Sequence, residues 1–530
     1  MATETDAVVI GGGHNGLVCA FYLARAGLKV TVLERQGIVG GAAVTEEFHP
    51  GFRNSVASYT VSLLNPRVIA DMDLHGHGLR IVERRASNFL PLNEREYLLT
   101  GEGRTHAEVA KFSTRDAARL DDYGKRLDDV VDVIRAFLLR TPPNVVTGGV
   151  LAALPQILEA YRSGRKIADA SMTVRRDLLA LFSQSAGDWL DGWFESDPIK
   201  AVFGFDAVVG NYASPYTPGS AYVLLHHVFG EVNGKKGAWG HAVGGMGAIT
   251  QAMAKACAAQ GVDIRTGAEV TEVLLDHRGA KGVVLASGAT IKARAVASNL
   301  NPKLLFTKLV DPSSLAADFT ERIRRYRCGS GTFRMNVALS ELPKFSCLPG
   351  NGDHMTAGII VAPSLAYMDR AFTDARQYGW SKAPIVEMLI PSTLDDTLAP
   401  RGTHVASLFC QHVAPRLPGG ASWDTARDTV ADLMIDTVDR LAPNFKSAVI
   451  ARQVLSPLDL ERRFGLVGGD IFHGALSIDQ MFSARPVLGH ADYRAPIKNL
   501  YMCGSGTHPG GGVTGAPGYN AAREIISDLK

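Results

Sequence analysis

The sequence has 530 residues, more than a single hydrophobic core usually serves, so we expect at least two lobes. Hydrophobic residues make up 46% of the chain and charged residues 20%, which is typical of a folded protein rather than a disordered one. The 55 basic and 53 acidic side chains leave a formal net charge of +2. Because this balance supplies no long-range field to attract nucleic acid, we expect no nucleic-acid partner.

The six cysteines are scattered along the chain, without a CxxC pair, a CxxxxC pair or the spacing of zinc ligands. The sequence therefore predicts no metal site. Enzymes that reduce disulfides through a dithiol need two nearby sulfurs, so that class is also disfavoured. A reduced compartment fits this cysteine usage, and the first residues are acidic, unlike those of a signal or transit peptide. We expect a cytoplasmic protein.

No apolar stretch reaches the ~20 residues that a membrane-spanning helix requires. The nearest to it is Val145–Leu154, which two glycines interrupt and which the basic residues Arg162, Arg165 and Lys166 follow. A buried helix or a channel wall is the favoured interpretation of this stretch. Peripheral contact with a membrane surface is the alternative, so membrane association of a cytoplasmic protein is left open.

A βαβ unit is predicted at the start of the chain. Residues 6–10 form a short apolar run, residues 17–26 have a helical pattern, and residues 29–33 form a second run rich in β-branched side chains. Strand, helix and strand in this order are typical of a parallel sheet covered by helices.

The turn after the first predicted strand contains Gly11, Gly13 and Gly16. Glycine at these positions permits a tight turn, lets the backbone approach a pyrophosphate and allows close packing of helix on strand. The amide groups at the start of the helix favour an anion. Glu34 ends the second strand at about the ~20-residue offset where an acid binds ribose hydroxyls, with a solvent-facing acid as the alternative. These residues fit NAD as well as FAD.

Two further glycine-rich segments decide between these cofactors. Gly40 and Gly41 follow the ribose acid closely and resemble the segment that extends along a bound FAD. Gly504–Gly515 precedes the last predicted helix and is similar to the loop that meets the pyrophosphate, the ribityl chain and the flavin. Either segment alone could be a surface loop, but two distant glycine loops that frame one cofactor are far more specific. The sequence therefore predicts FAD.

Helices and strands are both expected in the rest of the chain. The helical patterns cover residues 113–139 (with Ser113 and Asp116 as a capping pair), 175–194, 247–260, 423–441 and 519–529. The predicted strands cover residues 262–265, 269–275, 333–339, 358–361, 386–390 and 404–409.

The expected fold class is α/β, with a Rossmann-type, GR2-like FAD-binding lobe and an inserted α+β substrate lobe. The FAD-binding domain is expected to be discontinuous and to comprise residues 1–70, 236–308 and 483–530. Residues 71–235 and 309–482 are expected to form the substrate or cap domain.

Several segments together carry a resemblance to a known family. They are Gly40–Glu47 with Pro50–Phe52, Ser214–Tyr222, Gly237–Trp239 with Gly244–Gly247, Ile471–Gly474 and Gly506–Gly510. With them the chain resembles the phytoene-desaturase-related branch of the FAD-dependent amine-oxidase superfamily, and within it the group called pyridine nucleotide-disulfide oxidoreductase domain-containing protein 2. The likeness extends over nearly the whole chain. Disulfide activity does not follow from the group's name, because no redox cysteine pair is present.

The resemblance implies a two-lobed fold, noncovalently bound FAD, and an apolar tunnel beside the flavin for a hydrophobic or conjugated substrate. The backbone at Val270 would contact the adenine, and Val513 would lie under the pyrimidine end of the flavin, where amide donors stabilise the reduced flavin. The full set of expected cofactor-binding residues is Gly11, Gly13, His14, Asn15, Gly16, Glu34, Arg35, Gly40, Gly41, Ala42, Ala43, Val270, Gly504, Gly512 and Val513.

Two positions depart from the pattern of the superfamily. Ala42 follows the paired glycines where many relatives have an arginine, so the phosphates must be neutralised by other residues or by backbone alone. Ser505 follows the terminal-loop glycine where most amine oxidases have an acid. Amine oxidation is therefore less favoured than desaturation.

Desaturation by a flavin moves a hydride from one carbon to N5 and releases a proton from the neighbouring carbon, so the protein must position the C–H bond and exclude water. His473, His508 and Tyr519 are the candidates for a base, with a structural role as the alternative for each. His226 and His227 could suggest a metal site, but adjacent helical residues point in different directions, so we expect them to line the core or tunnel.

The leading hypothesis is an FAD-dependent dehydrogenase or desaturase that oxidises a C–C or C–N bond of a hydrophobic small molecule and is reoxidised by oxygen or a quinone. An FAD-dependent double-bond isomerase or saturase is the second hypothesis. A non-catalytic flavoprotein that serves as an interaction or assembly factor is the third. Formation of a homo-oligomer is left open.

Overall fold

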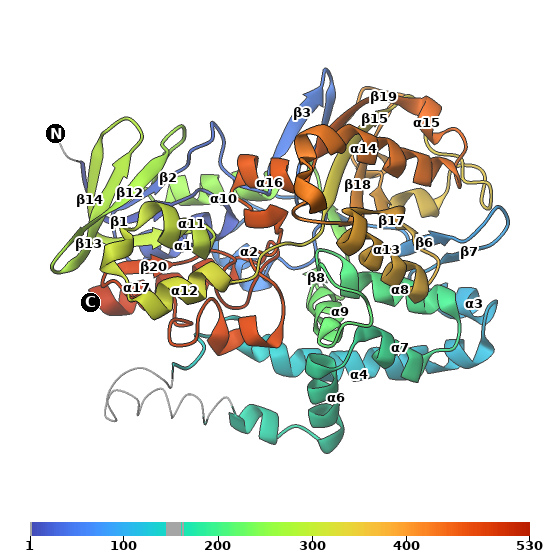
Figure 1. The fold of residues 1–530 in the computed structure, drawn as a ribbon, viewed down its shortest axis with the longest axis horizontal. Helices are drawn as coiled ribbons and strands as arrows, with labels where there is room; N and C mark the ends of the chain where they lie inside the picture. Colours follow the sequence, from blue (N-terminus) through green and yellow to red (C-terminus); the bar gives the residue numbers. More distant parts are fainter. Residues whose placement is uncertain (1–2, 145–160, 162–163) are drawn as a thin grey trace.

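The computed structural model describes residues 3–144, 161 and 164–530. Their strands form two large sheets, one in each half of the molecule (Figure 1). The stretch Val145–Leu154, considered above for membrane contact, lies outside the described residues. Within those residues, no helix combines the length and the apolar character that crossing a bilayer requires.

The first sheet contains the predicted βαβ unit. Its strand order is β11 (Asp263–Arg265), β2 (Val30–Leu33), β1 (Thr3–Ile10), β14 (Thr290–Ser298), β13 (Gly279–Leu285) and β12 (Val270–Asp276), with β20 (Leu500–Met502) also paired to β14. β11, β2, β1, β14 and β20 pair in parallel, whereas β12, β13 and β14 form an antiparallel meander. Because parallel strands point the same way, the ends of β2, β1, β14 and β20 lie at one edge of the sheet.

Both faces of this sheet are covered at its centre, which is why β2 and the second half of β1 are nearly continuous apolar runs. Ala7 and Val9 of β1 belong to the core with α1 (His14–Arg25), α10 (Gly247–Ala259) and α17 (Ala516–Leu529). Val8 and Ile10 belong to the core on the opposite face, to which α12 (Ala317–Arg325) also contributes. The structure thus packs α12 against the first sheet, although its residues fall in the range expected for the cap. The expected domain boundaries are otherwise untested and stay a prediction.

The second sheet has the order β19 (Val449–Leu455), β15 (Phe333–Leu339), β18 (His404–Val413), β17 (Trp380–Leu389), β16 (Gly358–Val361), β6 (Asn88–Pro91) and β7 (Tyr97–Leu99). All neighbours are antiparallel except β16 and β6. One face packs on α14 (Trp423–Asp439), and the other packs on α8 (Asp197–Val208) and α13 (Leu365–Tyr378).

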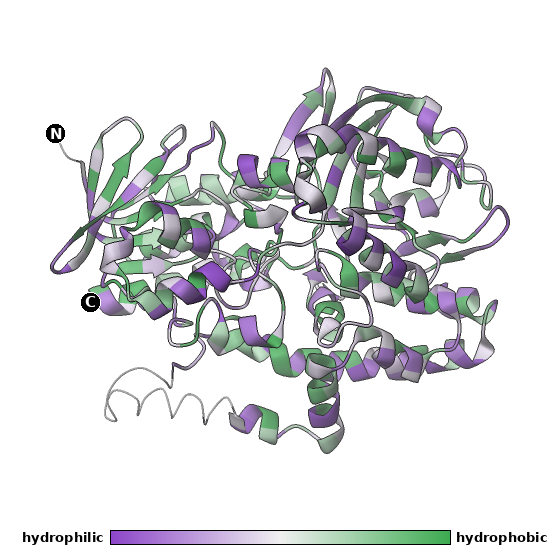
Figure 2. Ribbon diagram, viewed as in Figure 1, coloured by the Kyte–Doolittle hydropathy of each residue, from purple (hydrophilic) through white to green (hydrophobic). Residues whose placement is uncertain are grey.

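A helical layer lies below the second sheet in Figure 1. It contains α4 (Thr114–Leu138), α6 (Met172–Ser183), α7 (Ala186–Trp193), α8 and α9 (Ser220–Val228). The long helix α4 alternates between hydrophobic and hydrophilic stretches in Figure 2, as expected for a helix with one buried face. The region predicted as one helix over 175–194 is two helices, because Ser185 starts a new one by capping α7.

Short elements complete the fold. They are the hairpin β3 (Thr45–His49) and β4 (Phe52–Ser55), the pair β5 (Ile81–Glu83) and β10 (Gly240–Ala242), the pair β8 (Glu231–Val232) and β9 (Lys235–Lys236), and the helices α2 (Pro66–Asp71), α3 (Thr105–Ala110), α11 (Pro302–Leu304), α15 (Phe445–Ala448) and α16 (Pro457–Phe464). The segment after β4, residues 56–64, passes between the two sheets and becomes a wall of the site described below.

The expected capping pair of α4 is half correct. The Ser113 hydroxyl accepts a hydrogen bond from the Asp116 amide at 3.0 Å, as predicted. The buried Asp116 carboxylate, however, accepts hydrogen bonds from the amides of Glu195 and Ser196, at 3.0 and 2.8 Å, and from the Ser196 hydroxyl. Asp116 therefore joins α4 to the segment that leads into α8.

We expect Asp116→Ala to destabilise the fold by about 1–3 kcal/mol, because it leaves two part-buried amides and the Ser196 hydroxyl without their acceptor. Chemical or thermal unfolding of the purified protein measures this change. Asp128→Ala, at an exposed position of the same helix, is the matched control and should change stability little. Equal stabilities of the two variants would contradict the role given to Asp116.

Candidate active site

Two cavities lie between the sheets and share part of their lining. The first, of about 280 Å³, is lined among others by Gly11, Gly13, Glu34, Gly40, Gly41 and Val270. The second, of about 160 Å³, is lined largely by apolar residues of both halves. His14, Ala42, His473 and Ser505 line both cavities. An elongated molecule could therefore extend from the first cavity to the wall of the second.

The first cavity opens at the edge where the parallel strands end. Ile10 is in register with Leu33 and with Ser298, and Ser298 is in register with Met502. Loops leaving such an edge are the usual ligand-binding part of an open α/β sheet. Gly13, the N-cap of α1, has no side-chain cap hydrogen bond, so the first amides of the helix are left to bind an anion.

The predicted glycines are required by close backbone contacts. A Cβ on Gly16 would lie 2.2 Å from the Gly11 carbonyl oxygen, and a Cβ on Gly13 would lie 2.7 Å from Asn299 Nδ2. Gly40 has a φ of +133°, and its Cβ would lie 2.7 Å from Thr250 Oγ1. The cradle is therefore built from bare backbone, as a pyrophosphate-binding loop requires.

Glu34 is held in a fixed orientation at the first cavity. Its carboxylate accepts hydrogen bonds from the amides of Gly12 and Gln36, both at 2.8 Å. The neighbouring Arg35 also lines the cavity, and its guanidinium donates to the carbonyl oxygen of Arg463 at 2.7 Å. These residues fit the adenosine end of a dinucleotide, with Val270 on the wall beside them.

The terminal glycine loop contacts the first one. Asn15 Nδ2 donates a hydrogen bond to Ser505 Oγ at 3.0 Å, and His14 and Gly512 both line the second cavity. Gly512 and Val513 line the second cavity together with Ala43. Gly504 does not line either cavity, but it lets the loop pass close to β14, because its Cβ would lie 2.5 Å from the Asn299 carbonyl oxygen.

The buried Arg485 supports this loop, and sequence reasoning missed it. Its guanidinium donates to the carbonyl oxygens of Ser505 at 2.9 Å and Phe472 at 2.8 Å, and also to those of Gly474, Ala475 and Gln480. Arg485 thereby fixes the segment 472–480 against the terminal loop. It lies in a connecting segment without periodic pattern, so no local signal could have identified it.

Only one of the three predicted bases lines a cavity. His473 lines both, its Nδ1 has no hydrogen-bond partner among the described residues, and burial lowers its pKa to about 3, so the ring is neutral and is a weak base. His508 is instead hydrogen-bonded to the Phe137 carbonyl oxygen, and Tyr519 packs edge-to-face on Tyr22. Neither of those two is placed to take a proton from a molecule in the cavities.

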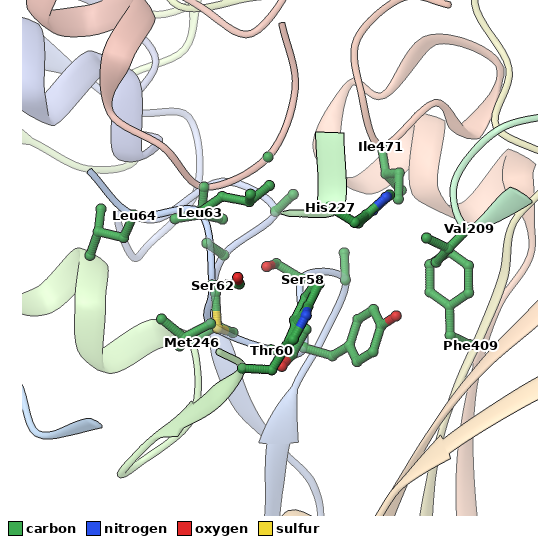
Figure 3. A pocket seen from close by; sticks show the side chains of 18 of the residues that line it. Ser58, Thr60, Ser62, Leu63, Leu64, Val209, His227, Met246, Phe409 and Ile471 are labelled. Atoms are coloured by element: carbon green, nitrogen blue, oxygen red, sulfur yellow. The ribbon is translucent and has the colours of Figure 1, made fainter. Parts of the chain in front are cut away.

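The second cavity has mainly apolar walls. Figure 3 shows Leu63, Leu64 and Met246 on one side of it and Val209 and Phe409 on the other. The first three belong to the segment after β4 and the start of α10, whereas the others come from α8 and the second sheet. Such walls exclude water and fit a hydrophobic ligand.

The two adjacent histidines of α9 have different surroundings. His227 lines the second cavity, its ring stacks on Trp239 at 6.0 Å, and burial lowers its pKa to about 4. The His226 ring is perpendicular to it, at 89°, and does not line either cavity. The two rings therefore do not converge on one point, as a shared metal ion would require.

A group of polar side chains interrupts the apolar walls, and sequence reasoning missed it. Arg84, Asp206 and Glu387 line the second cavity together with Tyr59, whose hydroxyl donates to Glu387 at 2.5 Å. Burial, with the Glu387 carboxylate nearby, raises the pKa of Asp206 to about 8. These residues come from distant elements, so only the tertiary structure brings them together.

Comparison with known proteins identifies the class of the protein. The model of a family described as "Flavin containing amine oxidoreductase" matches residues 16–333. The chain belongs to this family and is a flavin-dependent oxidoreductase.

Within this family, the chain is 42% identical to the pyridine nucleotide-disulfide oxidoreductase domain-containing protein 2 of Rattus norvegicus, over 99% of this chain and 94% of the relative. It is 25% identical to the phytoene desaturase (lycopene-forming) of Pseudescherichia vulneris, over 99% of each chain. The structure of an oxidoreductase from Methanosarcina mazei superposes with a TM-score of 0.61 at 16% identity, over 98% of this chain and 100% of that one. The resemblance and the α/β fold class with a Rossmann-type lobe are thus confirmed.

The raised pKa of Asp206 predicts a pH-dependent cost of folding. In the unfolded chain this carboxyl has its ordinary pKa of 3.8, whereas in the folded protein the pKa is about 8. The folded state therefore holds the proton more tightly, and stability is lost as the pH rises from about 4 to about 8. Asp206→Asn should remove this loss, so its melting temperature should exceed that of the wild type more at about pH 8.5 than at about pH 5.

The exposed Asp122 provides the matched control for this measurement. Asp122→Asn should shift the melting temperature little at either pH. If the melting temperatures of Asp206→Asn and the wild type differ by the same amount at both pH values, Asp206 ionises normally in the folded protein.

Proposed function

We propose that the protein is an FAD-dependent dehydrogenase or desaturase that binds FAD noncovalently in the first cavity and oxidises a C–C or C–N bond of a hydrophobic small molecule in the second. The observation that carries this proposal is the junction of the two cavities at His14, Ala42, His473 and Ser505. A cofactor that enters the second cavity there would present its reactive end to a molecule enclosed by apolar walls.

The residues of the first cavity suit FAD. Its adenosine would lie by Glu34 and Val270, its pyrophosphate by the glycine turn at the start of α1, and its flavin by Gly512 and Val513. Ala42 supplies no charge to the phosphates, so the amides of the helix start would stabilise them.

Bound FAD would supply the hydride acceptor. The chain would position the substrate, exclude water from it and receive the proton. The apolar side chains around the second cavity exclude water and hold the substrate near the junction. The unpaired His473 Nδ1 at the junction is placed to take the proton released from the carbon next to the one oxidised, but with a pKa of about 3 it would pass the proton on and not hold it. Electrons would pass on to oxygen or a quinone.

Disulfide chemistry, which the name of the rat relative suggests, has no support in this site. No cysteine lines either cavity among the described residues. Cys19 and Cys503 are in contact, but they are buried in the core behind the terminal loop. The hydrogen bond between them and their burial raise the pKa of Cys19, so that its thiol is not a nucleophile. Desaturation instead agrees with the name of the relative from Pseudescherichia vulneris, a phytoene desaturase.

Glu34→Gln should weaken FAD binding by about tenfold or more, because an uncharged amide binds ribose hydroxyls less strongly than a carboxylate does. Titration of the deflavinated protein with FAD, followed by flavin fluorescence, measures the affinity. Glu272→Gln, an exposed position on β12, is the matched control and should bind FAD as the wild type does. An unchanged affinity of Glu34→Gln would remove Glu34 from the FAD site.

The activity itself is tested by anaerobic flavin reduction. Purified protein should be yellow, should release FAD when denatured, and should be bleached by its substrate among candidate polyenes, retinoids and amines, with colour restored by oxygen or a quinone. A flavin that none of these compounds bleaches would count against oxidation. Turnover without an electron acceptor would indicate an isomerase, a requirement for external reductant would indicate a saturase, and an inert flavin with a stoichiometric partner would indicate an assembly factor.

A further inference from the structure

The second cavity has a polar end that the proposed oxidation does not use. Arg84 follows β5, Asp206 lies on α8, Glu387 lies on β17, and Tyr59 belongs to the segment after β4. A Cβ built on Gly358 would lie 3.0 Å from Glu387 Oε1 and 3.3 Å from Arg84 Nη1, so these two side chains converge at one place. A cavity for a pure hydrocarbon would gain nothing from such a group, because burying charges without a partner is costly.

Arg84 has donors without acceptors. Its side chain is half-buried at the cavity wall, and its Nη2 donates to Thr60 Oγ1 at 2.5 Å. Its guanidinium also lies over the Trp239 ring, at 5.9 Å. In the part of the chain that the structure describes, Arg84 forms no ion pair and no second hydrogen bond, although a guanidinium has five N–H donors. The cavity therefore contains a cation with unused donors.

Asp206 is a second donor beside it. Its carboxyl forms no hydrogen bond with any described residue, and the pKa of about 8 keeps it protonated at neutral pH. The Glu387 carboxyl already accepts the Tyr59 hydroxyl, and burial raises its pKa as well. A protonated carboxyl can donate a hydrogen bond to an anion.

The charge of this polar end is never negative. Arg84 and the fully buried Arg334, whose guanidinium lies 4.5 Å over the Tyr59 ring, contribute two positive charges. Glu387 and Asp206 contribute at most two negative charges, and fewer while either carboxyl holds its proton. While either carboxyl holds its proton, the polar end therefore carries a net positive charge, which favours an anionic ligand over a cationic one.

We propose that this polar end binds the carboxylate of an apolar organic acid, with Arg84 as its ion-pair partner and Asp206 as a second hydrogen-bond donor. The substrate class is then a carboxylic acid with a hydrophobic chain. The carboxylate is held at the polar end, and the chain extends along the apolar walls towards the junction of the cavities. This inference rests on the proposed function, since it names the substrate class for the same site.

Binding of matched eight-carbon probes tests the proposal. Isothermal titration calorimetry of the flavin-loaded full chain with octanoate, 1-octanol and octylamine compares three head groups on one tail. Octanoate should bind about tenfold or more tightly than either of the others, as expected for charge-assisted hydrogen bonds. Equal or tighter binding of octylamine or 1-octanol would overturn the proposal.

Substitutions at Arg84 test whether this side chain causes the preference for octanoate. Arg84→Gln should weaken octanoate binding about tenfold or more and leave 1-octanol binding unchanged, whereas Arg84→Lys should keep part of the preference. Arg85→Gln removes the same charge from the adjacent exposed position and should bind octanoate as the wild type does. Flavin content and melting temperature show whether each variant is folded. Wild-type affinity in a folded Arg84→Gln variant would overturn the proposal, and if that variant does not fold, Arg84→Lys and the three probes still decide it.

The pH dependence of octanoate binding tests whether Asp206 donates a hydrogen bond to the carboxylate. Octanoate affinity of the wild type should fall as the pH rises through about 8, because ionised Asp206 no longer donates and repels the anion, whereas Asp206→Asn should show no such fall. The groups facing Asp206 are Glu387, Arg84, Tyr123 on α4 and His227 on α9. Glu387 is present in both proteins, and burial raises the pKa of Tyr123 and lowers that of His227 to about 4. If the wild type binds octanoate equally well below and above pH 8, Asp206 is not a hydrogen-bond donor to the carboxylate.

The two proposals fail separately. A preparation that binds no FAD under any condition would end the proposed function. A flavin-loaded protein that its substrate reduces, but that does not prefer octanoate, would end the inference about the carboxylate alone.

Discussion

The close approach of three backbone segments at one edge of the first sheet is the constraint on which the rest of the site depends. A side chain on Gly16 would overlap the Gly11 carbonyl oxygen, and one on Gly504 would overlap the carbonyl oxygen of Asn299. Because no side chain intervenes, the loops after β1, β14 and β20 pack on one another and leave the first amides of α1 open to a ligand. Their register follows from parallel pairing of strands that are far apart in the sequence.

The two halves of the molecule contribute different chemistry. The first sheet offers mainly backbone, which suits the phosphates and sugars of a nucleotide, whatever the substrate. The second sheet and the helical layer offer side chains, both apolar and charged, which determine the substrate that fits. His473 stands where the two meet and is held there by the segment that Arg485 fixes. Relatives can therefore keep the cofactor site and change the substrate by changing side chains of the second half.

Local patterns predicted much of the fold and the glycine-lined part of the site. The predicted strands at 333–339 and 358–361 coincide with β15 and β16, because both are short runs of buried residues with clear ends. The glycine loops were predictable because the residues that form each of them are close together in the sequence. Arg84, Asp206 and Glu387 were not, since each is an unremarkable polar residue until folding brings three distant elements together. His508 lies in the terminal loop and Tyr519 follows it closely, yet both side chains are buried away from the two cavities.

The order of the strands also has a consequence for synthesis. β1 is made long before β20, yet both pair with β14, and the loop that follows β20 lines the second cavity. A ribosome releases the amino-terminal part of a chain first. All strands of the second sheet are therefore made before the cofactor site can be completed, and a flavin would bind only to a chain in which α17 has docked beside α1. The cofactor would then stabilise the protein after it has folded and would not direct its folding.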